Sequence, residues 1–452
     1  MIRRSLAQTV LNGFRHPAQI IVAGFGTAVG VGTALLSTPV ATASGRPTGV
    51  IDALFTATSA VCVTGLITVD TPAHWSVFGQ VVILVLIQAG GLGIMTLATL
   101  FAVMISGRLG LRARMLAQAE TKSLQMTDLR RVIRNVVLFS VAAEALTAVV
   151  LTARFITGYG EPVGRALYLG VFHAISAFNN AGFALWSDNL IGFVADPWIC
   201  LPIAVAVIVG GLGFPVVFEL LRAWRHPRKW SVLTRITVVA TVVLLVLGAL
   251  VFTVTEWSNP QTLGPLSDPA KLLAGFFTGV MPRTAGFNSL DIAQMYPSSW
   301  LATDVLMFIG GGSAGTAGGI KVTTFGVLVF VIWAELRGEN RVNVGRRRLS
   351  DSMQRQALAI ALLGAGLVAL STYVLLILTP HSLDAVLFET VSAFATVGLS
   401  TGITADLTAP GQVVVALLMF AGRVGPLTLF SALALRERTR RYELPEERTI
   451  VG

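Results

Sequence analysis

The chain contains eight apolar runs, each long enough to cross a lipid bilayer as a helix and separated from the next by a polar connection. The predicted spans are residues 20–36, 77–105, 132–156, 199–221, 232–254, 301–333, 357–378 and 413–435. Charged residues make up 12% of the chain, whereas a soluble domain carries about 25%. We therefore predict an all-α integral membrane protein with a single transmembrane domain over residues 1–452.

The basic residues predict the orientation in the membrane. Most of the 33 Lys and Arg residues lie in the N-terminal segment, in the connections after the second, fourth and sixth spans, and in the C-terminal segment. Positively charged connections stay on the cytoplasmic side. The pattern predicts a multi-pass plasma-membrane protein with both termini in the cytoplasm. It also accounts for the net charge of +10 without a nucleic-acid partner.

The four connections on the opposite side share a phenylalanine ten residues before a glycine. The pairs are Phe55 and Gly65, Phe172 and Gly182, Phe276 and Gly286, and Phe388 and Gly398. In three of them a serine lies six residues before the glycine, at Ser59, Ser176 and Ser392. The recurrence predicts four tandem helix–pore loop–helix repeats, at about residues 17–107, 129–223, 231–337 and 352–437, arranged pseudo-fourfold around one central pore. Residues 438–452 would form a short cytoplasmic C-terminal tail.

The short segment before each glycine is a candidate pore loop. It is too short to span a bilayer, and irregular backbone at membrane depth is tolerated only where it is packed in protein or lines a water-filled path. The glycine permits a positive φ, which allows carbonyl oxygens to face an ion, and rings of such carbonyls select potassium in channels. The predicted filter strips are Cys62, Val63, Thr64 and Gly65; Asn179, Asn180, Ala181 and Gly182; Arg283, Thr284, Ala285 and Gly286; and Ala395, Thr396, Val397 and Gly398.

Each span that follows a strip contains a further glycine cluster, and the third cluster predicts a break in its helix. It comprises Gly310, Gly311, Gly312, Ser313, Ala314, Gly315, Thr316, Ala317, Gly318 and Gly319. Each glycine costs a helix about 1 kcal/mol relative to alanine, so this segment is a candidate gate below the filter.

Two cations accompany these clusters. Arg423 occupies a position where other copies have glycine, and a charge at mid-membrane depth faces either a cavity or a partner. Arg423 is therefore either a pore residue or half of a buried ion pair. Lys321 follows the glycine-rich segment and either faces the cavity or extends toward the inner membrane surface.

Catalytic chemistry is not predicted. The five histidines lack metal-ligand spacing, and two cysteines, Cys62 and Cys200, are too few for a disulfide framework or a metal site, so both are expected to pack in the interior. Residues 310–315 match the dinucleotide pattern G-x-G-x-x-G but lack the strand and acidic residue that it requires. We predict that the chain is not an enzyme and binds no nucleotide itself.

These motifs resemble the Trk/Ktr/HKT superfamily of potassium transporters over nearly the whole chain, most closely the bacterial KtrB type of membrane subunit. The matching segments are TSAVCVTGLI at 58–67, NNAGF at 179–183, RTAGFN at 283–288, ATVGLSTG at 395–402 and the C-terminal ELPEERTIVG. The resemblance implies potassium as the transported ion, with sodium as a candidate activator. A glycine in all four filters, including Gly65, accompanies potassium selectivity in this family.

The resemblance also implies how the protein is gated and what it binds. The glycine-rich intramembrane loop would close the cavity, and the matching arginine, Arg423, would act as an electrostatic barrier below the filter. The membrane subunit would form a homodimer in the lipid bilayer, on a cytoplasmic ring of nucleotide-binding regulatory subunits.

Three alternative functions predict other patterns. A sodium-selective or weakly selective transporter of the same fold is disfavoured by Gly65. A secondary carrier for an organic solute predicts inverted repeats, whereas repeats of two spans each share one orientation. A membrane enzyme requires a paired acid and base, which the spans lack.

Overall fold

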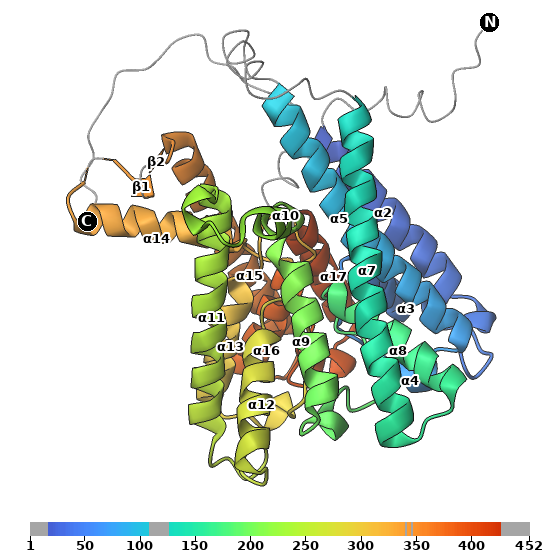
Figure 1. Cartoon of the computed structure of the whole chain (residues 1–452). Helices are drawn as coiled ribbons and strands as arrows, with labels where there is room; N and C mark the ends of the chain where they lie inside the picture. The colour runs from blue at the N-terminus through green and yellow to red at the C-terminus, as the bar shows by residue number, and fades with distance from the viewer. Residues whose placement is uncertain (1–16, 108–125, 340, 345–346, 426–452) are drawn as a thin grey trace, which may run out of the picture.

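The computed structural model describes residues 17–107, 126–339, 341–344 and 347–425, and these are almost entirely helical (Figure 1). The α-helices are α2 (Pro17–Leu36), α3 (Val50–Val61), α4 (Thr71–His74), α5 (Val77–Gly107), α7 (Met126–Tyr159), α8 (Val163–Phe178), α9 (Pro197–Leu212), α10 (Phe214–Ala223), α11 (Val232–Glu256), α12 (Asp268–Val280), α13 (Pro297–Phe308), α14 (Val322–Leu336), α15 (Asp351–Leu378), α16 (Leu383–Ala395) and α17 (Ala409–Val424). Single 3₁₀ turns are η1 (Pro39–Ala41), η2 (Ile191–Phe193), η3 (Pro227–Lys229), η4 (Ile292–Gln294) and η5 (Ile403–Asp406). A two-stranded antiparallel hairpin joins β1 (Asn343–Val344) to β2 (Arg347–Arg348), with Asn343 opposite Arg348.

Three helices in the described part are long and apolar enough to cross a membrane on their own, over Ile133–Tyr159, Val232–Glu256 and Asp351–Leu378. Most residues on these helices are not buried inside the protein, and large apolar side chains such as Leu146, Val246 and Leu362 are exposed. Exposed apolar side chains on a spanning helix are compatible with lipid. The chain is therefore a multi-pass membrane protein.

Two predicted spans are broken in the structure. The prediction of a continuous helix over 199–221 was wrong, because α9 and α10 meet at an angle of 101° at Gly213. Gly213 has φ +88°, and a Cβ there would lie 2.2 Å from the Ser313 carbonyl oxygen, so only glycine fits this bend. The break predicted within 301–333 is confirmed, since α13 ends at Phe308 and α14 begins at Val322. The predicted span 413–435 extends beyond the described residues, which end at 425.

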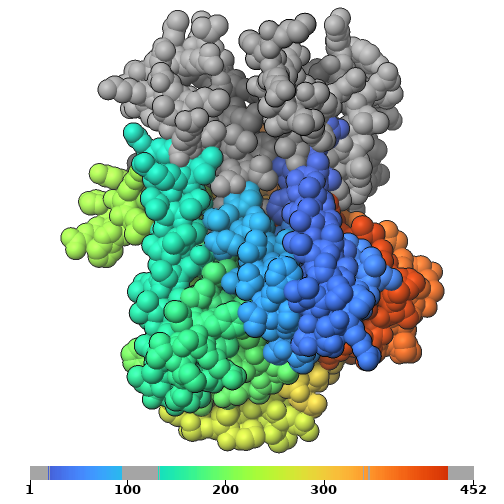
Figure 2. Space-filling view, turned by 90° about the vertical axis from the view of Figure 1, so that its right-hand side faces the viewer, coloured from blue at the N-terminus to red at the C-terminus, as the bar shows by residue number. Residues whose placement is uncertain are grey.

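Four short helices, α3, α8, α12 and α16, each pack against the longer helix that precedes them, α2, α7, α11 and α15 respectively. Each short helix also contacts the helix that begins the second predicted span of the neighbouring repeat. Thus α8 contacts α5, α12 contacts α9 and α16 contacts α13, while α3 of the first repeat contacts α17 of the fourth. The last of these contacts joins the two ends of the described chain, so the contacts form a closed circuit. Figure 2 shows one side of it, where the blue residues of the first unit adjoin the teal and green residues of the second.

The recurring phenylalanines lie in the interior. Phe55, Phe172 and Phe388 are at most 1% exposed, and they anchor their short helices in two large apolar clusters. In the third unit the fully buried ring belongs to Phe277 rather than to Phe276, which is only partly buried. The two cysteines are buried and free, as predicted, and the Cys200 thiol donates to a backbone carbonyl at 3.3 Å.

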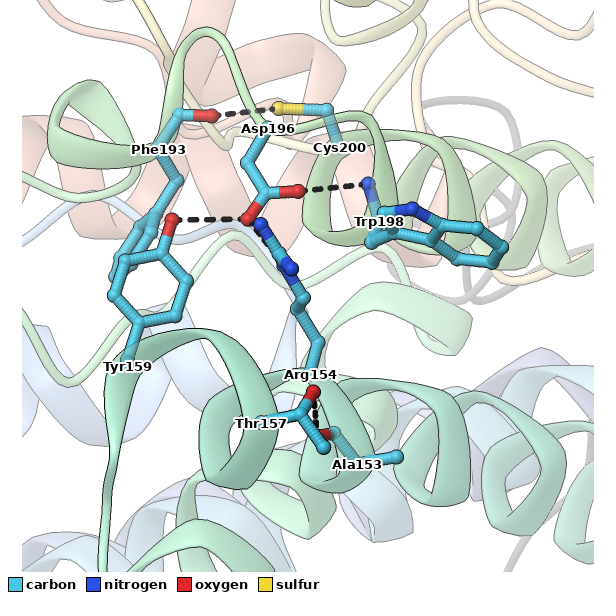
Figure 3. A network of polar contacts seen from close by, with 8 residues as sticks. All are labelled: Ala153, Arg154, Thr157, Tyr159, Phe193, Asp196, Trp198 and Cys200. Carbon is cyan, nitrogen blue, oxygen red and sulfur yellow. Dashed lines mark hydrogen bonds and ion pairs between the residues drawn. The ribbon is translucent and has the colours of Figure 1, made fainter.

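A polar network fastens the second unit on the side opposite the basic connections (Figure 3). Asp196 caps α9 by accepting from the Trp198 backbone N–H at 2.9 Å. Its other carboxylate oxygen accepts from Arg154 Nε at 2.7 Å and from the Tyr159 hydroxyl at 2.9 Å. These contacts tie the end of α7 to the start of α9, and so fix the loop that follows the second strip.

Candidate functional site

The four predicted strips share one backbone conformation. The residue two before each glycine has a left-handed φ, at Val63 (56°), Asn180 (60°), Thr284 (73°) and Thr396 (51°). The glycines also have positive φ, at Gly65 (97°), Gly182 (70°), Gly286 (73°) and Gly398 (93°). Left-handed conformations are costly for non-glycine residues and persist only where the surrounding structure enforces them. The sequence repeat therefore corresponds to a repeat in backbone geometry.

The four glycines approach one another in a closed ring. A Cβ on Gly65 would lie 2.4 Å from the Ala181 carbonyl oxygen, and one on Gly182 would lie 2.8 Å from that of Ala285. The series continues from Gly286 to Val397, at 2.3 Å, and from Gly398 to Thr64, at 2.1 Å. Each glycine thus meets the residue before the next glycine, and the fourth returns to the first. Contacts under 3.0 Å leave no room for any side chain at these positions.

The recurring serines hold two of the strips. Ser59 Oγ accepts from the Gly65 N–H at 3.0 Å, and Ser392 Oγ accepts from the Gly398 N–H at 3.1 Å. Ser176 differs, because its hydroxyl donates to the Phe183 carbonyl at 2.8 Å. The serine thus bonds the loop backbone in all three units, by accepting from the ring glycine in two and by donating to the following carbonyl in the other.

Arg283 is the charged residue of the strips, and its side chain extends toward neighbouring helices. Arg283 is 7% exposed, and its guanidinium donates to the Thr241 carbonyl at 3.2 Å and to the Thr241 hydroxyl at 3.3 Å, both on α11. It also donates to the Gly310 carbonyl at 3.4 Å, where the glycine-rich segment begins. Arg283 therefore connects the third strip to that segment and to α11.

The inner glycine clusters allow helices to approach the ends of the short helices. A Cβ on Gly90, Gly210 or Gly422 would lie 2.0, 1.9 or 1.8 Å from the carbonyl of Val61, Phe178 or Phe394 respectively. Those carbonyls lie four residues before the glycines of strips one, two and four. Close packing of helices, which glycine permits, therefore accounts for the first, second and fourth clusters.

The glycine-rich segment, residues 309–321, is an irregular loop placed between two strips. On one side, Gly312 N–H donates to the Gly211 carbonyl at 2.7 Å and Thr316 N–H donates to the Gly210 carbonyl at 3.1 Å. The Thr316 hydroxyl donates to the Phe178 carbonyl at 3.2 Å and lies 3.1 Å from the Asn180 amide. The loop is thus bonded to the end of the second short helix and to the second strip.

The other side of this loop touches the fourth strip. A Cβ on Gly318 would lie 1.8 Å from the Thr396 hydroxyl oxygen, and one on Gly319 would lie 3.3 Å from Cα of Ala395. Of the remaining loop residues, Gly311 precedes these contacts in the chain, and Ser313, Ala314, Gly315 and Ala317 lie between them. The loop therefore reaches from the second strip to the fourth.

Two cations bind the carbonyls of this loop. The Arg423 guanidinium donates to the Thr316 carbonyl and, at 3.3 Å, to the Gly90 carbonyl of α5. Arg423 is 4% exposed, and no ion pair to it is found in the described part of the chain. Lys321 Nζ donates to the Ala317 carbonyl. The two side chains therefore hold neighbouring carbonyls of the loop.

The sequence interpretation missed a polar network behind the second strip. Asn179 Nδ2 donates to Gln88 Oε1 at 2.7 Å and to Glu144 Oε1 at 3.2 Å, and Gln88 Nε2 donates to the same carboxylate at 3.0 Å. Glu144 is 7% exposed and lies within a predicted span. An ionisable residue at such a position is a functional candidate by default, so this signal was available in the sequence.

An open pocket of about 360 Å³ lies against three of the four ring glycines, Gly65, Gly182 and Gly398. Its lining includes three carboxylates from three units, Asp70, Asp188 and Asp291. Negative charge at the mouth of a pathway raises the local concentration of cations. The pocket is therefore suited to receive a cation.

Comparison with known proteins is consistent with this geometry. The sequence model of the TrkH family, described as cation transport protein, matches residues 11–439. The chain is 41% identical over 423 residues to Ktr system potassium uptake protein B of Bacillus subtilis (strain 168), covering 94% of each chain. It is 35% identical over 442 residues to the potassium/sodium uptake protein NtpJ of Enterococcus hirae, covering 96% of this chain and 97% of the other.

A solved structure shows the same fold. The potassium transporter TrkH from Vibrio parahaemolyticus superposes with a TM-score of 0.73 at 18% identity, covering 92% of this chain and 85% of that one. At this identity the likeness shows the fold alone. The match to the family model and the relatives at 41% and 35% identity together show which family the chain belongs to. The chain belongs to the TrkH family of cation transport proteins, which are not enzymes.

Proposed function

We propose that this protein takes up potassium across the plasma membrane through a selectivity filter formed by the four strips. The observation that carries the proposal is the closed ring of glycines, Gly65, Gly182, Gly286 and Gly398. Rings of backbone carbonyls replace the hydration shell of potassium in selective channels. The names of relatives, which include Ktr system potassium uptake protein B, support the choice of ion.

The four units form a pseudo-fourfold pore in this proposal. The closed circuit of contacts between helices supports it, because each unit adjoins the next and the fourth adjoins the first. Potassium enters from the pocket that contains Asp70, Asp188 and Asp291, and loses water as it reaches the ring. Both termini lie in the cytoplasm, on the side that the basic connections predict.

The glycine-rich loop is the gate, and Arg423 holds it closed. The guanidinium bonds Thr316 of the loop and Gly90 of α5, so that the closed loop and the first unit are joined through α17. Lys321 adds positive charge at the same loop. The contacts to carbonyls support a role in gating over the alternative of a buried ion pair.

We further propose that the chain forms a homodimer and is controlled by a cytoplasmic ring of nucleotide-binding regulatory subunits, as the resemblance to the KtrB type implies. The nucleotide then binds to that partner and not to this chain. Sodium acts as an activator, and the name of the potassium/sodium uptake protein NtpJ supports an effect of sodium.

Rubidium flux into liposomes that contain the purified protein tests the filter. Gly65→Ser is expected to weaken discrimination of potassium from sodium, because the added side chain meets the Ala181 carbonyl at 2.4 Å. Gly366→Ser is the matched control, since Gly366 is exposed and a Cβ added there would have nothing within 4 Å. Unchanged competition by sodium in a folded Gly65→Ser protein would remove the filter assignment, and sodium flux in the parent would favour the sodium-selective alternative.

A further inference from the structure

An open pocket lined by four basic side chains lies at the start of α11, on the side of the basic connections. Its volume is about 930 Å³. The cations come from three segments: Arg228 and Lys229 from η3, Arg235 from α11, and Arg347 from β2. The side chain of Trp230 also lines the pocket. Segments distant in the sequence thus bring positive charge to one cavity.

Packing of the hairpin and hydrogen bonds in the turn hold this arrangement in place. Val344 of β1 is 5% exposed and belongs to an apolar cluster that includes Ile236 of α11 and residues of α14 and α15. Its strand partner, Arg347 of β2, is therefore held near the start of α11. The Trp230 indole N–H donates to the Ala223 carbonyl at 2.9 Å. The pocket is therefore a built feature of the fold.

Glu219 of α10 is a carboxylate beside the start of α11, where it accepts hydrogen bonds from neutral donors. It accepts from the Ser231 N–H at 2.6 Å, the Ser231 hydroxyl at 2.7 Å and the Thr234 hydroxyl at 2.5 Å. Within the described residues none of the four cations forms an ion pair, whereas nearby Arg348 pairs with Asp351. Glu219 offsets part of this positive charge, but the four cations of the pocket exceed it, and the N-terminus of a 25-residue helix adds to the excess.

The position of the pocket relative to the membrane indicates the kind of anion that it binds. α11 is a membrane-crossing helix, and apolar side chains such as Val239, Val242 and Val243 are exposed on it directly after the pocket. Tryptophan is enriched where a membrane protein crosses the boundary between lipid tails and water. An anion bound here would have its charge in the pocket and an apolar surface beside it.

We propose that this pocket binds the phosphate headgroup of an anionic phospholipid, with the acyl chains lying along α11. Basic pockets between membrane helices on the cytoplasmic side bind acidic headgroups, and the apolar flank would contribute nothing to binding of a free phosphate. Only the assignment to the cytoplasmic leaflet rests on the proposed topology; the pocket itself does not.

Native mass spectrometry of the purified chain, incubated with phosphatidylglycerol or phosphatidylcholine, tests the site. The test protein carries Arg228→Gln, Lys229→Gln and Arg235→Gln. The control carries Arg222→Gln, Arg225→Gln and Arg341→Gln, which remove the same charge from exposed residues outside the pocket. We expect the test protein to lose affinity for phosphatidylglycerol by about 100-fold, given a contribution of about fivefold from each basic residue. The affinity of the control protein for phosphatidylglycerol should stay within about threefold of that of the parent. Phosphatidylcholine should not bind selectively to the parent, the test protein or the control.

Several results would overturn the proposal. Equal losses in the test and control proteins would show general surface attraction, and no loss in either would show that lipid does not occupy the pocket. Displacement of phosphatidylglycerol by millimolar inorganic phosphate would assign the site to a soluble anion. A variant with Arg228→Lys and Arg235→Lys keeps the charge and should keep the lipid, whereas loss of lipid from this variant would contradict a site that depends on positive charge. Lipid binding is measured without ion flux, so its failure is distinct from failure of the proposed transport.

Discussion

Replacing Arg423 by glutamine should open the gate. In the structure its guanidinium makes one hydrogen bond to the loop, at Thr316, and one to α5, at Gly90. A hydrogen bond from a charged group contributes about 1.5–3 kcal/mol. Loss of the bond to the loop alone would therefore shift the balance between closed and open loop by about 10- to 150-fold, since 1.4 kcal/mol corresponds to a factor of ten.

The assay is rubidium flux in liposomes, with the melting temperature measured on the same purified proteins. Arg423→Gln and Arg423→Ala should both conduct faster than the parent, by up to about 100-fold where the closed loop limits flux. Arg423→Lys keeps the charge and should remain nearer to the parent. Loss of an ion-pair partner would instead leave a buried acid and cost about 3–5 kcal/mol. A destabilised Arg423→Gln protein with no gain in flux would refute the reasoning.

Three further substitutions test other parts of the site. Deletion of residues 311–318 should raise flux, and a folded, inserted deletion protein that conducts no faster than the parent would exclude the loop as gate. Arg283→Met should destabilise the protein by about 3 kcal/mol, because it leaves buried acceptors unpaired, whereas Arg165→Met, at a side chain that is 66% exposed, should not. Gly213→Ala should cost at least about 1–3 kcal/mol, because strain at φ +88° is joined by the contact of the added Cβ with the Ser313 carbonyl. The melting temperature should fall, with Gly366→Ala as the control, and equal melting temperatures would show that the bend is not constrained.

Local composition determined much of this protein from the sequence. Apolar runs of membrane length predicted spanning helices, and in the described residues three of them are helices long and apolar enough to cross a membrane on their own. The density of glycine in 310–319 predicted the break in the third inner helix, because glycine has a large entropic cost in a helix whatever surrounds it. Sequence patterns of this kind depend only on residues that are neighbours in the chain, so they can be recognised before the fold is known.

The contacts between distant segments were decided only by the tertiary structure. Gly213 produces a bend of 101° because Ser313 packs against it, whereas the similarly placed Gly93 lies within the continuous helix α5. The sequence placed Arg283 in the third strip, but only the structure showed that its guanidinium bonds Thr241 and Gly310. A glycine permits a bend and an arginine supplies donors, but which carbonyl or side chain lies within reach depends on how all the helices pack together.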